Sequence, residues 1–266
     1  MLRLLAPMVL VGALACSDDG TSGTGTVVVR LTDAPADDFA SAVVYISEVT
    51  VKGSGASANE IVISDTPQSY DLLTLQNGVT ATLGTATVPT GTYSQIRLLV
   101  DSARVTLKSG NTFADGTTSA KLTVPSGSQT GIKVTFSPPV TVTEDQTVLV
   151  VDFDINQSFI FQGPRNNPTS ISFRPVLHAT ALDVAGSISG IILPVTAQAT
   201  VYAIAGTDTV QTTFANVTTG AYTLQFLPPG TYVVGASATG FQSATSASLT
   251  LSNAQALTGI NLTLLP

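Results

Sequence analysis

The strongest constraint on the fold is a period-two alternation of apolar and polar residues that begins at Val27 and continues toward the C-terminus. Val, Ile, Thr and Tyr dominate the alternating runs, and turn residues interrupt them at short intervals, as is typical of β-proteins. A short helix is expected only within 72–84. The chain is therefore predicted to be all-β. We predict strands at 27–31, 43–49, 60–64, 93–100, 104–108, 121–124, 132–136, 147–155 and 171–182.

The composition indicates a well-packed core and excludes one class of binding partner. Hydrophobic residues make up 44% of the 266-residue chain and charged residues only 10%, so a buried core is easily built. Ten Lys and Arg stand against seventeen Asp and Glu, which leaves a net charge of -7. An acidic surface repels phosphate, so nucleic acid is excluded as a partner.

The N-terminal sequence is typical of an export signal. One Arg precedes an apolar run, 4–14, that is too short to span a bilayer as a helix, which needs roughly 20 residues. The sequence Ala13-Leu14-Ala15-Cys16 resembles the lipobox of bacterial lipoproteins. The resemblance implies a signal peptide at 1–15, an acylated Cys16 that anchors the protein to the membrane, and a location in the bacterial cell envelope. A plain secretory signal cut after Ala15, or a buried Cys16, is the alternative.

Residues 16–25 form a polar, Gly-rich tether. Ser17, directly after the cysteine, resembles the signal for sorting to the outer membrane.

Charge divides the remaining chain near Val184. All ten basic residues and the one His lie upstream, and Asp208 is the single ionisable acid downstream. We therefore predict two domains, 26–184 and 185–266. The second contains Gly220-Ala221-Tyr222, Leu227-Pro228-Pro229-Gly230-Thr231-Tyr232 and Gly240-Phe241 in an order that resembles carboxypeptidase regulatory-like domains. That family implies a transthyretin-like β-sandwich related to starch-binding and collagen-adhesin modules.

The first domain resembles a bacterial lipoprotein family known as domain of unknown function 4382. The matching motifs are Leu31-Thr32-Asp33-Ala34-Pro35, Tyr70-Asp71-Leu72-Leu73, Val88-Pro89-Thr90-Gly91-Thr92-Tyr93, Asp152-Phe153-Asp154 and Arg174-Pro175-Val176. The family implies no activity. The motif Pro89-Thr90-Gly91-Thr92-Tyr93 repeats the pattern of 228–232, so we expect the same kind of turn to lead into a strand in each domain. We also expect both domains to be Ig-like or transthyretin-like sandwiches.

The residues offer little catalytic chemistry, and we predict that the protein is not an enzyme. His178 is expected to be a structural strand residue, and no nucleophile motif or zinc cluster accompanies it. A deep pocket lined by His178 and converging acids would contradict this interpretation. The other chemical groups are carboxylates. Five of them are candidates for a structural calcium ion: Asp33, Asp37, Asp38, Asp152 and Asp154.

Two alternatives to calcium remain open. The acids can organise turns and pair with Arg97, Arg174 or Lys133, or Asp152 and Asp154 can act as a glycosidase-like pair. No cofactor is expected apart from the calcium.

For a ligand, Phe159 and Phe161 are the candidates to stack on a sugar ring, with ordinary core packing as the alternative. The sequence thus favours an envelope lipoprotein that acts as a non-enzymatic binding or adhesion module, with carbohydrate as the ligand class. The alternative is a scaffold that docks to another envelope protein, with the second domain as a stalk.

Overall fold

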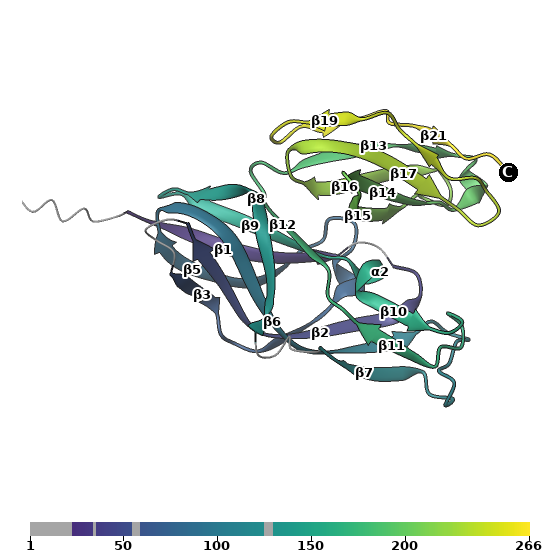
Figure 1. The fold of residues 1–266 in the computed structure, drawn as a ribbon, viewed down its shortest axis with the longest axis horizontal. Coiled ribbons are helices and arrows are strands. Elements are labelled where there is room, and N and C mark those ends of the chain that lie inside the picture. Colours follow the sequence, from purple (N-terminus) through teal and green to yellow (C-terminus); the bar gives the residue numbers. More distant parts are fainter. Residues whose placement is uncertain (1–22, 34–35, 55–58, 125–129) are drawn as a thin grey trace, which may run out of the picture.

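The computed structural model describes residues 23–33, 36–54, 59–124 and 130–266, so the signal peptide and Cys16 lie outside the described residues. The chain forms two β-sandwich domains in succession (Figure 1). The predicted all-β class is confirmed. Within the described residues, no helix is long and apolar enough to cross a membrane.

The first domain packs two sheets face to face. The smaller sheet has the order β12 (Leu177–Ala181), β9 (Gln146–Phe153), β1 (Thr24–Asp33) and β5 (Ala81–Pro89). Strands β1 and β9 run parallel, and the other pairs are antiparallel. The larger sheet consists of β3 (Glu60–Ser64), β2 (Phe39–Gly53), β6 (Gly91–Leu107) and β7 (Ser119–Thr123), with β4 (Gln68–Asp71) on β2 and β8 (Ile132–Val142) on β6. A hairpin of β10 (Phe159–Gln162) and β11 (Ser170–Phe173) extends one end.

Alternation along β9 places side chains in two environments. Leu149, Val151 and Phe153 point into the core between the two sheets. Val150 and Asp152 point to the opposite face, which would meet water in an isolated sandwich, yet they are only 1% and 4% exposed. The second domain covers this face.

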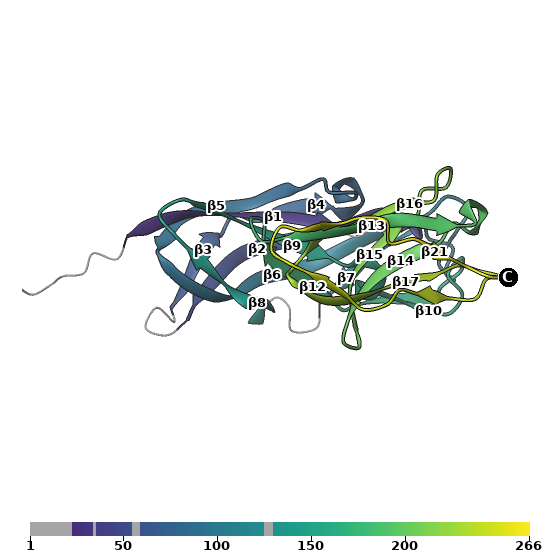
Figure 2. The ribbon, with the colours of Figure 1, turned by 90° about the horizontal axis from the view of Figure 1, so that it is seen from above.

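The second domain has its own core, which starts at Ile188, whereas the first core ends near Ala181. One of its sheets contains β16 (Ala221–Leu227), β13 (Gly186–Leu193), β20 (Ala256–Leu257) and β21 (Leu262–Thr263). The other contains β15 (Asp208–Phe214), β14 (Thr200–Ala205), β17 (Gly230–Ser237), β18 (Ala244–Thr245) and β19 (Leu249–Leu251), and the short helix η3 (Val195–Ala197) follows β13. The view from above places this domain over β9 and β12 (Figure 2).

Three strand predictions differ from the structure. The strands predicted at 93–100 and 104–108 are one continuous strand, β6, and the strand predicted to reach residue 155 ends at Phe153, before a helical turn. The single strand predicted at 171–182 is two strands, β11 and β12, because Pro175 between them has no N–H for a ladder. The short helix expected within 72–84 is present as a 3-10 helix, η2 (Leu72–Leu75), which is capped by the Asp71 side chain: its carboxylate accepts a hydrogen bond from the Leu73 N–H at 3.2 Å.

The repeated Pro-x-Gly-Thr-Tyr motif makes the same contact in both domains. The Tyr93 hydroxyl donates a hydrogen bond to the Pro89 carbonyl at 2.8 Å, and the Tyr232 hydroxyl donates one to the Pro228 carbonyl at 2.6 Å. Both tyrosines are buried, so each ring fills the core while its hydroxyl ties the turn to the strand. The backbone differs, because Gly91 has a positive φ of 147° and Gly230 does not have a positive φ.

We expect Tyr93→Phe and Tyr232→Phe each to lower the free energy of unfolding by about 1 kcal/mol, because each removes one buried hydrogen bond. Urea denaturation measures the change. Tyr45→Phe is the control, since the Tyr45 hydroxyl has no hydrogen bond with another described residue. A loss no larger than that of the control would contradict the shared role of the motif.

Candidate functional site

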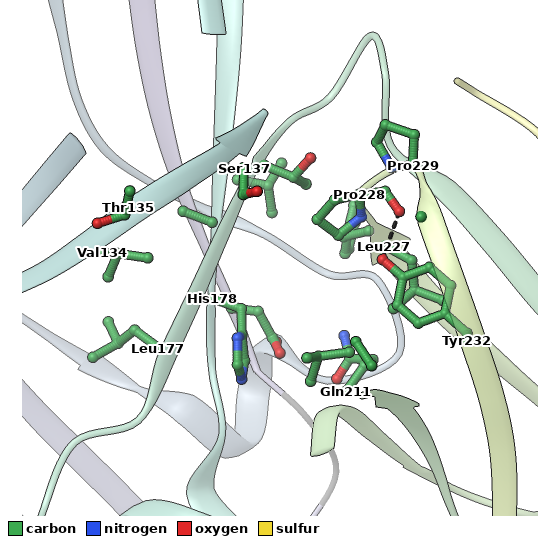
Figure 3. Close-up of a pocket in the computed structure, with 18 of the residues that line it drawn as sticks. Val134, Thr135, Ser137, Leu177, His178, Gln211, Leu227, Pro228, Pro229 and Tyr232 are labelled. Atoms are coloured by element: carbon green, nitrogen blue, oxygen red, sulfur yellow. Dashed lines mark hydrogen bonds between the residues drawn. The ribbon is translucent and has the colours of Figure 1, made fainter. Parts of the chain in front are cut away.

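A cleft of about 440 Å³ lies between the two domains. Its first wall is the outer face of β9 and β12 together with the start of β8, and its second wall comes from β15 and the turn between β16 and β17. Figure 3 shows Ser137 and His178 on the first wall, opposite Pro228 and Tyr232 on the second. The volume is in the range of small-molecule sites, which are often found at domain interfaces.

Strand register brings the polar residues of the first wall together. His178 on β12 is the cross-strand neighbour of Asp152 on β9, and Thr180 is the neighbour of Val150. Each pair shares a face of the sheet, so the alternation that sends Phe153 into the core sends Asp152 and His178 into the cleft.

Asp152 is an unpaired buried acid. Neither of its carboxylate oxygens has a hydrogen-bond partner among the described residues. The pKa of Asp152 is raised to about 8, mainly by burial and in addition by the charge of Asp154, while the nearby Gln211 side chain partly opposes the rise. The group is therefore a neutral, protonated carboxyl at pH 7.

Asp33 is a second acid of this kind. It ends β1, next to β9, and both of its oxygens are likewise buried without a hydrogen-bond partner in the described part of the chain. Burial is the main cause that raises the pKa of Asp33 well above its usual value, and the charges of Asp152 and Asp154 add to it. The Ile155 N–H and the Gln76 side chain lie close enough to oppose the shift, although neither makes a hydrogen bond of ordinary geometry to the carboxyl. Perturbed acids that share a partly closed space are typical of functional sites.

Asp154 has a different role. Its carboxylate caps the short helix α2 (Ile155–Ser158) by accepting hydrogen bonds from the Gln157 N–H at 2.9 Å and the Gln157 Nε2 at 2.7 Å. The same Nε2 also donates to the Thr209 carbonyl of the second domain at 3.1 Å. Asp154 thus holds a glutamine that links the two domains.

A loop of the first domain adds another contact with the second. Gly78 has a φ of 85°, and a Cβ there would collide with the side chain of Gln225. Only glycine suits both the backbone and the close approach.

His178 is neutral in the cleft. Burial lowers its pKa, against the opposing charges of Asp154 and Asp208. Its Nε2 has no hydrogen-bond partner among the described groups, although Ser137 and Asp152 line the same cleft. A Ser-His-Asp triad requires hydrogen bonds from the His to both partners, and neither is formed here, because His178 Nε2 and both Asp152 oxygens have no hydrogen-bond partner among the described residues. The pocket lined by His178 and an acid, which the sequence interpretation did not expect, is nevertheless present.

The five acids predicted to bind calcium do not form one group. Asp37 pairs with Lys108 at 2.6 Å and Asp38 pairs with Arg165, so these two are neutralised by the chain itself. Across the described ranges, no three His, Cys, Asp or Glu side chains are placed to hold a metal together. The alternative that Asp152 or Asp154 pairs with Arg97 is wrong, because Arg97 contacts Glu48 at 3.1 Å and Glu60 at 2.8 Å.

The predicted sugar-stacking pair is also corrected. Phe159 is 3% exposed and packs between Phe39 and Phe173, with ring centroids 5.4 and 4.8 Å away. Phe161 stacks on Phe39 at 5.5 Å, and the Arg165 guanidinium lies 5.0 Å over its ring. Neither ring has a face available to a sugar, so core packing accounts for both.

The sequence interpretation missed the second wall of the cleft. Gln211, Phe226 and Tyr232 line it, and they carry no charge or motif typical of a site. The one available signal was the repeated Pro-x-Gly-Thr-Tyr motif, which places Pro228 and Tyr232 at the same turn.

Comparison with known proteins identifies both domains. The family model described as Domain of unknown function (DUF4382) matches residues 24–175. The chain belongs to this family. In this DUF4382 protein, residues 187–265 also match the model of the carboxypeptidase regulatory-like domain. None of the curated proteins compared with the chain matches it significantly.

Several solved structures resemble the DUF4382 protein weakly. The Bacillus anthracis TIE protein is 10% identical with a TM-score of 0.26, over 92% of this chain and 35% of its own, so this chain spans about a third of that protein. The minor pilin GBS52 of Streptococcus agalactiae is 12% identical with a TM-score of 0.24, over 91% and 95% of the two chains. The shaft pilin SpaA of Lactobacillus rhamnosus GG is 10% identical with a TM-score of 0.23, over 91% and 98%. At these TM-scores none of them carries an argument about function.

The buried acid of the cleft makes stability depend on pH. Folded Asp152 keeps its proton up to a pKa of about 8, whereas the ordinary value is 3.8. The folded state therefore holds more protons between these values, and the free energy of unfolding falls as the pH rises from 4 to 8, by on the order of 5 kcal/mol for this group. Asp33 acts in the same direction. His178 acts in the opposite direction, since its lowered pKa costs stability as the pH falls below about 6.5.

We expect Asp152→Asn to flatten this decline, because the amide does not titrate. Urea denaturation at pH 5, 7 and 9, in buffer with a chelator, measures the slope. Asp37→Asn, which changes an exposed carboxylate, should leave the slope as it is in the unmodified chain. Equal slopes for Asp152→Asn and the unmodified chain would show that Asp152 is ionised in the folded state.

Proposed function

We propose that this DUF4382 protein is an envelope lipoprotein that binds a carbohydrate, without converting it, in the cleft between its domains. The observation that carries the proposal is the 440 Å³ cleft with unpaired polar groups on Asp152 and His178. A ligand that supplies donors and acceptors there would satisfy buried groups that otherwise have no partner.

The chemistry of the walls supports a sugar. Hydroxyl and amide groups of Thr135, Ser137, Thr180 and Gln211 line the cleft beside apolar surface from Pro228. Sugars present hydroxyls around an apolar ring, so mixed walls of this kind suit them. A neutral Asp152 both donates and accepts a hydrogen bond, as a hydroxyl-rich ligand requires.

The anchor is a separate part of the proposal. Acylation of Cys16 would hold the protein at the membrane, in the outer membrane by the Ser17 signal, and the tether up to residue 25 would separate the domains from the surface. The alternative to ligand binding is a scaffold in which the cleft has no occupant and the second domain serves as a stalk.

Blocking the cleft tests the proposal. Thr135 is exposed on β8 and lines the cleft, so Thr135→Arg should narrow it and weaken binding on a glycan array at least tenfold. Thr141→Arg is the matched control, because Thr141 is exposed on the same strand away from the cleft. Binding that both variants retain would place the ligand elsewhere. No glycan binding, with recovery of an envelope protein partner, would favour the scaffold.

One observation favours a second function. Ser137, His178 and Asp152 line the same cleft and are the residue types of acyl-transfer enzymes, although His178 Nε2 and both Asp152 oxygens lack the required hydrogen bonds among the described residues. Treating the same protein with a serine-directed fluorophosphonate distinguishes the two. The binding proposal expects no labelling, and labelling that Ser137→Ala abolishes would establish a hydrolase.

A further inference from the structure

A second groove, of about 660 Å³, lies in the first domain and shares no lining residue with the cleft between the domains. Its walls are the strands β7 and β11, which are neighbours in space (Figure 1). Backbone hydrogen bonds tie together the loops that precede the two strands, from the Thr112 N–H to the Asn166 carbonyl at 3.2 Å and from the Ala114 N–H to the Pro168 carbonyl at 3.0 Å. The groove is therefore held at one end by the fold itself.

Strand β7 turns a free edge toward this groove. It is the last strand of the larger sheet, and among the described residues only β6 pairs with it. The hydrogen bond from the Leu107 N–H to the Thr118 carbonyl, at 2.9 Å, sets the alternation of the antiparallel ladder. The backbone N–H and C=O groups of Ser119, Lys121 and Thr123 consequently point away from β6, on the side of the groove.

The floor of the groove is apolar. Phe113, Leu122, Ile171 and Phe173 line it, and all four are buried. Strand β11 pairs only with β10 in the described part of the chain, so a second free edge borders the same space. A free strand edge beside apolar pockets is the arrangement that strand addition uses, in which main-chain hydrogen bonds give affinity and pockets for alternate side chains give specificity.

The rim of the groove is basic. Lys121 and Arg174 line it and are exposed, and the exposed Arg104 is the cross-strand neighbour of Lys121. None of these three forms an ion pair within the described ranges. The acid of the described lining, Asp115, accepts hydrogen bonds from the Thr117 N–H at 2.9 Å and the Thr117 hydroxyl at 2.7 Å. Three of the ten basic residues of an acidic chain thus gather where they have no acidic partner.

We propose that this groove binds an extended segment of a partner protein in which apolar and acidic side chains alternate, and that the segment adds to β7 as an extra strand. About five residues, or roughly 17 Å of strand, match the length of β7. The apolar side chains pack on the floor, and the acidic ones point to the opposite side, toward Arg104, Lys121 and Arg174. This inference does not depend on carbohydrate binding in the cleft.

Peptide selection against the full chain tests the proposal. A phage-displayed library of random octapeptides should yield enriched sequences in which apolar and acidic residues alternate. A synthetic peptide of the enriched sequence should bind the unmodified chain in a fluorescence anisotropy titration, and Lys121→Glu and Arg174→Glu should each weaken binding at least tenfold. Lys52→Glu reverses an exposed charge at the other end of the larger sheet and should leave the affinity unchanged.

The main-chain contacts are tested separately from the charges. N-methylation of every second amide in the same peptide should abolish binding, because it removes donors to the strand edge while it keeps every side chain. Thr123→Pro, at an exposed position, removes an N–H that points away from β6 and should also weaken binding at least tenfold. If a variant proves unstable, the methylated peptide decides the question with the unmodified chain.

Three results would overturn the proposal: no enriched peptide, enriched peptides that lack acidic residues, or binding that both Lys121→Glu and Arg174→Glu retain. The first of these would mean that Lys121 only protects a strand edge from aggregation. Self-association of the chain that Lys121→Glu abolishes would make a second copy the occupant and would contradict a partner protein. Glycan binding is measured with Thr135→Arg in the other cleft, so failure of one proposal does not decide the other.

Discussion

Burial of a polar sheet face under a second domain is the constraint on which the rest of this structure depends. The sheet β12-β9-β1-β5 has one face in its own core and turns the other toward the second domain. A sandwich of this type usually leaves its outer face to water, where acids are fully solvated. Here Asp152 and Asp33 are instead removed from water, and no ion pair neutralises either of them among the described residues, although Lys133 and His178 line the same cleft as Asp152. Their raised pKa values follow directly from that burial.

The uneven charge of the two domains explains why the acids are unpaired. Every basic residue of the sequence lies before the second domain, and the ion pairs of Arg97, Lys108 and Arg165 are made with acids of the first domain itself. The second domain presents neutral amides, hydroxyls and carbonyls. Its Gln225 side chain lies close to Gly78, and its Thr209 carbonyl accepts a hydrogen bond from Gln157, but neutral groups cannot neutralise a carboxylate. The interface therefore holds the domains together by hydrogen bonds and packing, and it keeps Asp152 buried as a neutral carboxyl.

The sequence predicted the parts of the fold that depend on local pattern. Alternation located the strands because side chains on a strand alternate between two faces, and the repeated Pro-x-Gly-Thr-Tyr motif correctly predicted a shared device at Tyr93 and Tyr232. Pro175 was the one overlooked interruption.

The site was less predictable, because alternation predicts which face of a sheet a side chain occupies and does not predict which other segment packs on that face. Asp152 was placed on the face opposite Phe153, but its burial depends on residues such as Gln211, about sixty positions later in the chain. Phe161 looked like an exposed aromatic for the same reason, since Phe39 and Arg165 cover it from distant segments.

The central claim is that the two domains form one body through this buried face. Spin labels at Thr141→Cys on β8 and Thr250→Cys on β19, in a Cys16→Ser background, report the distance between the domains directly by pulsed electron paramagnetic resonance. A single narrow distance distribution is the predicted result. A broad distribution, as from two domains that move independently about residues 182–187, would contradict it.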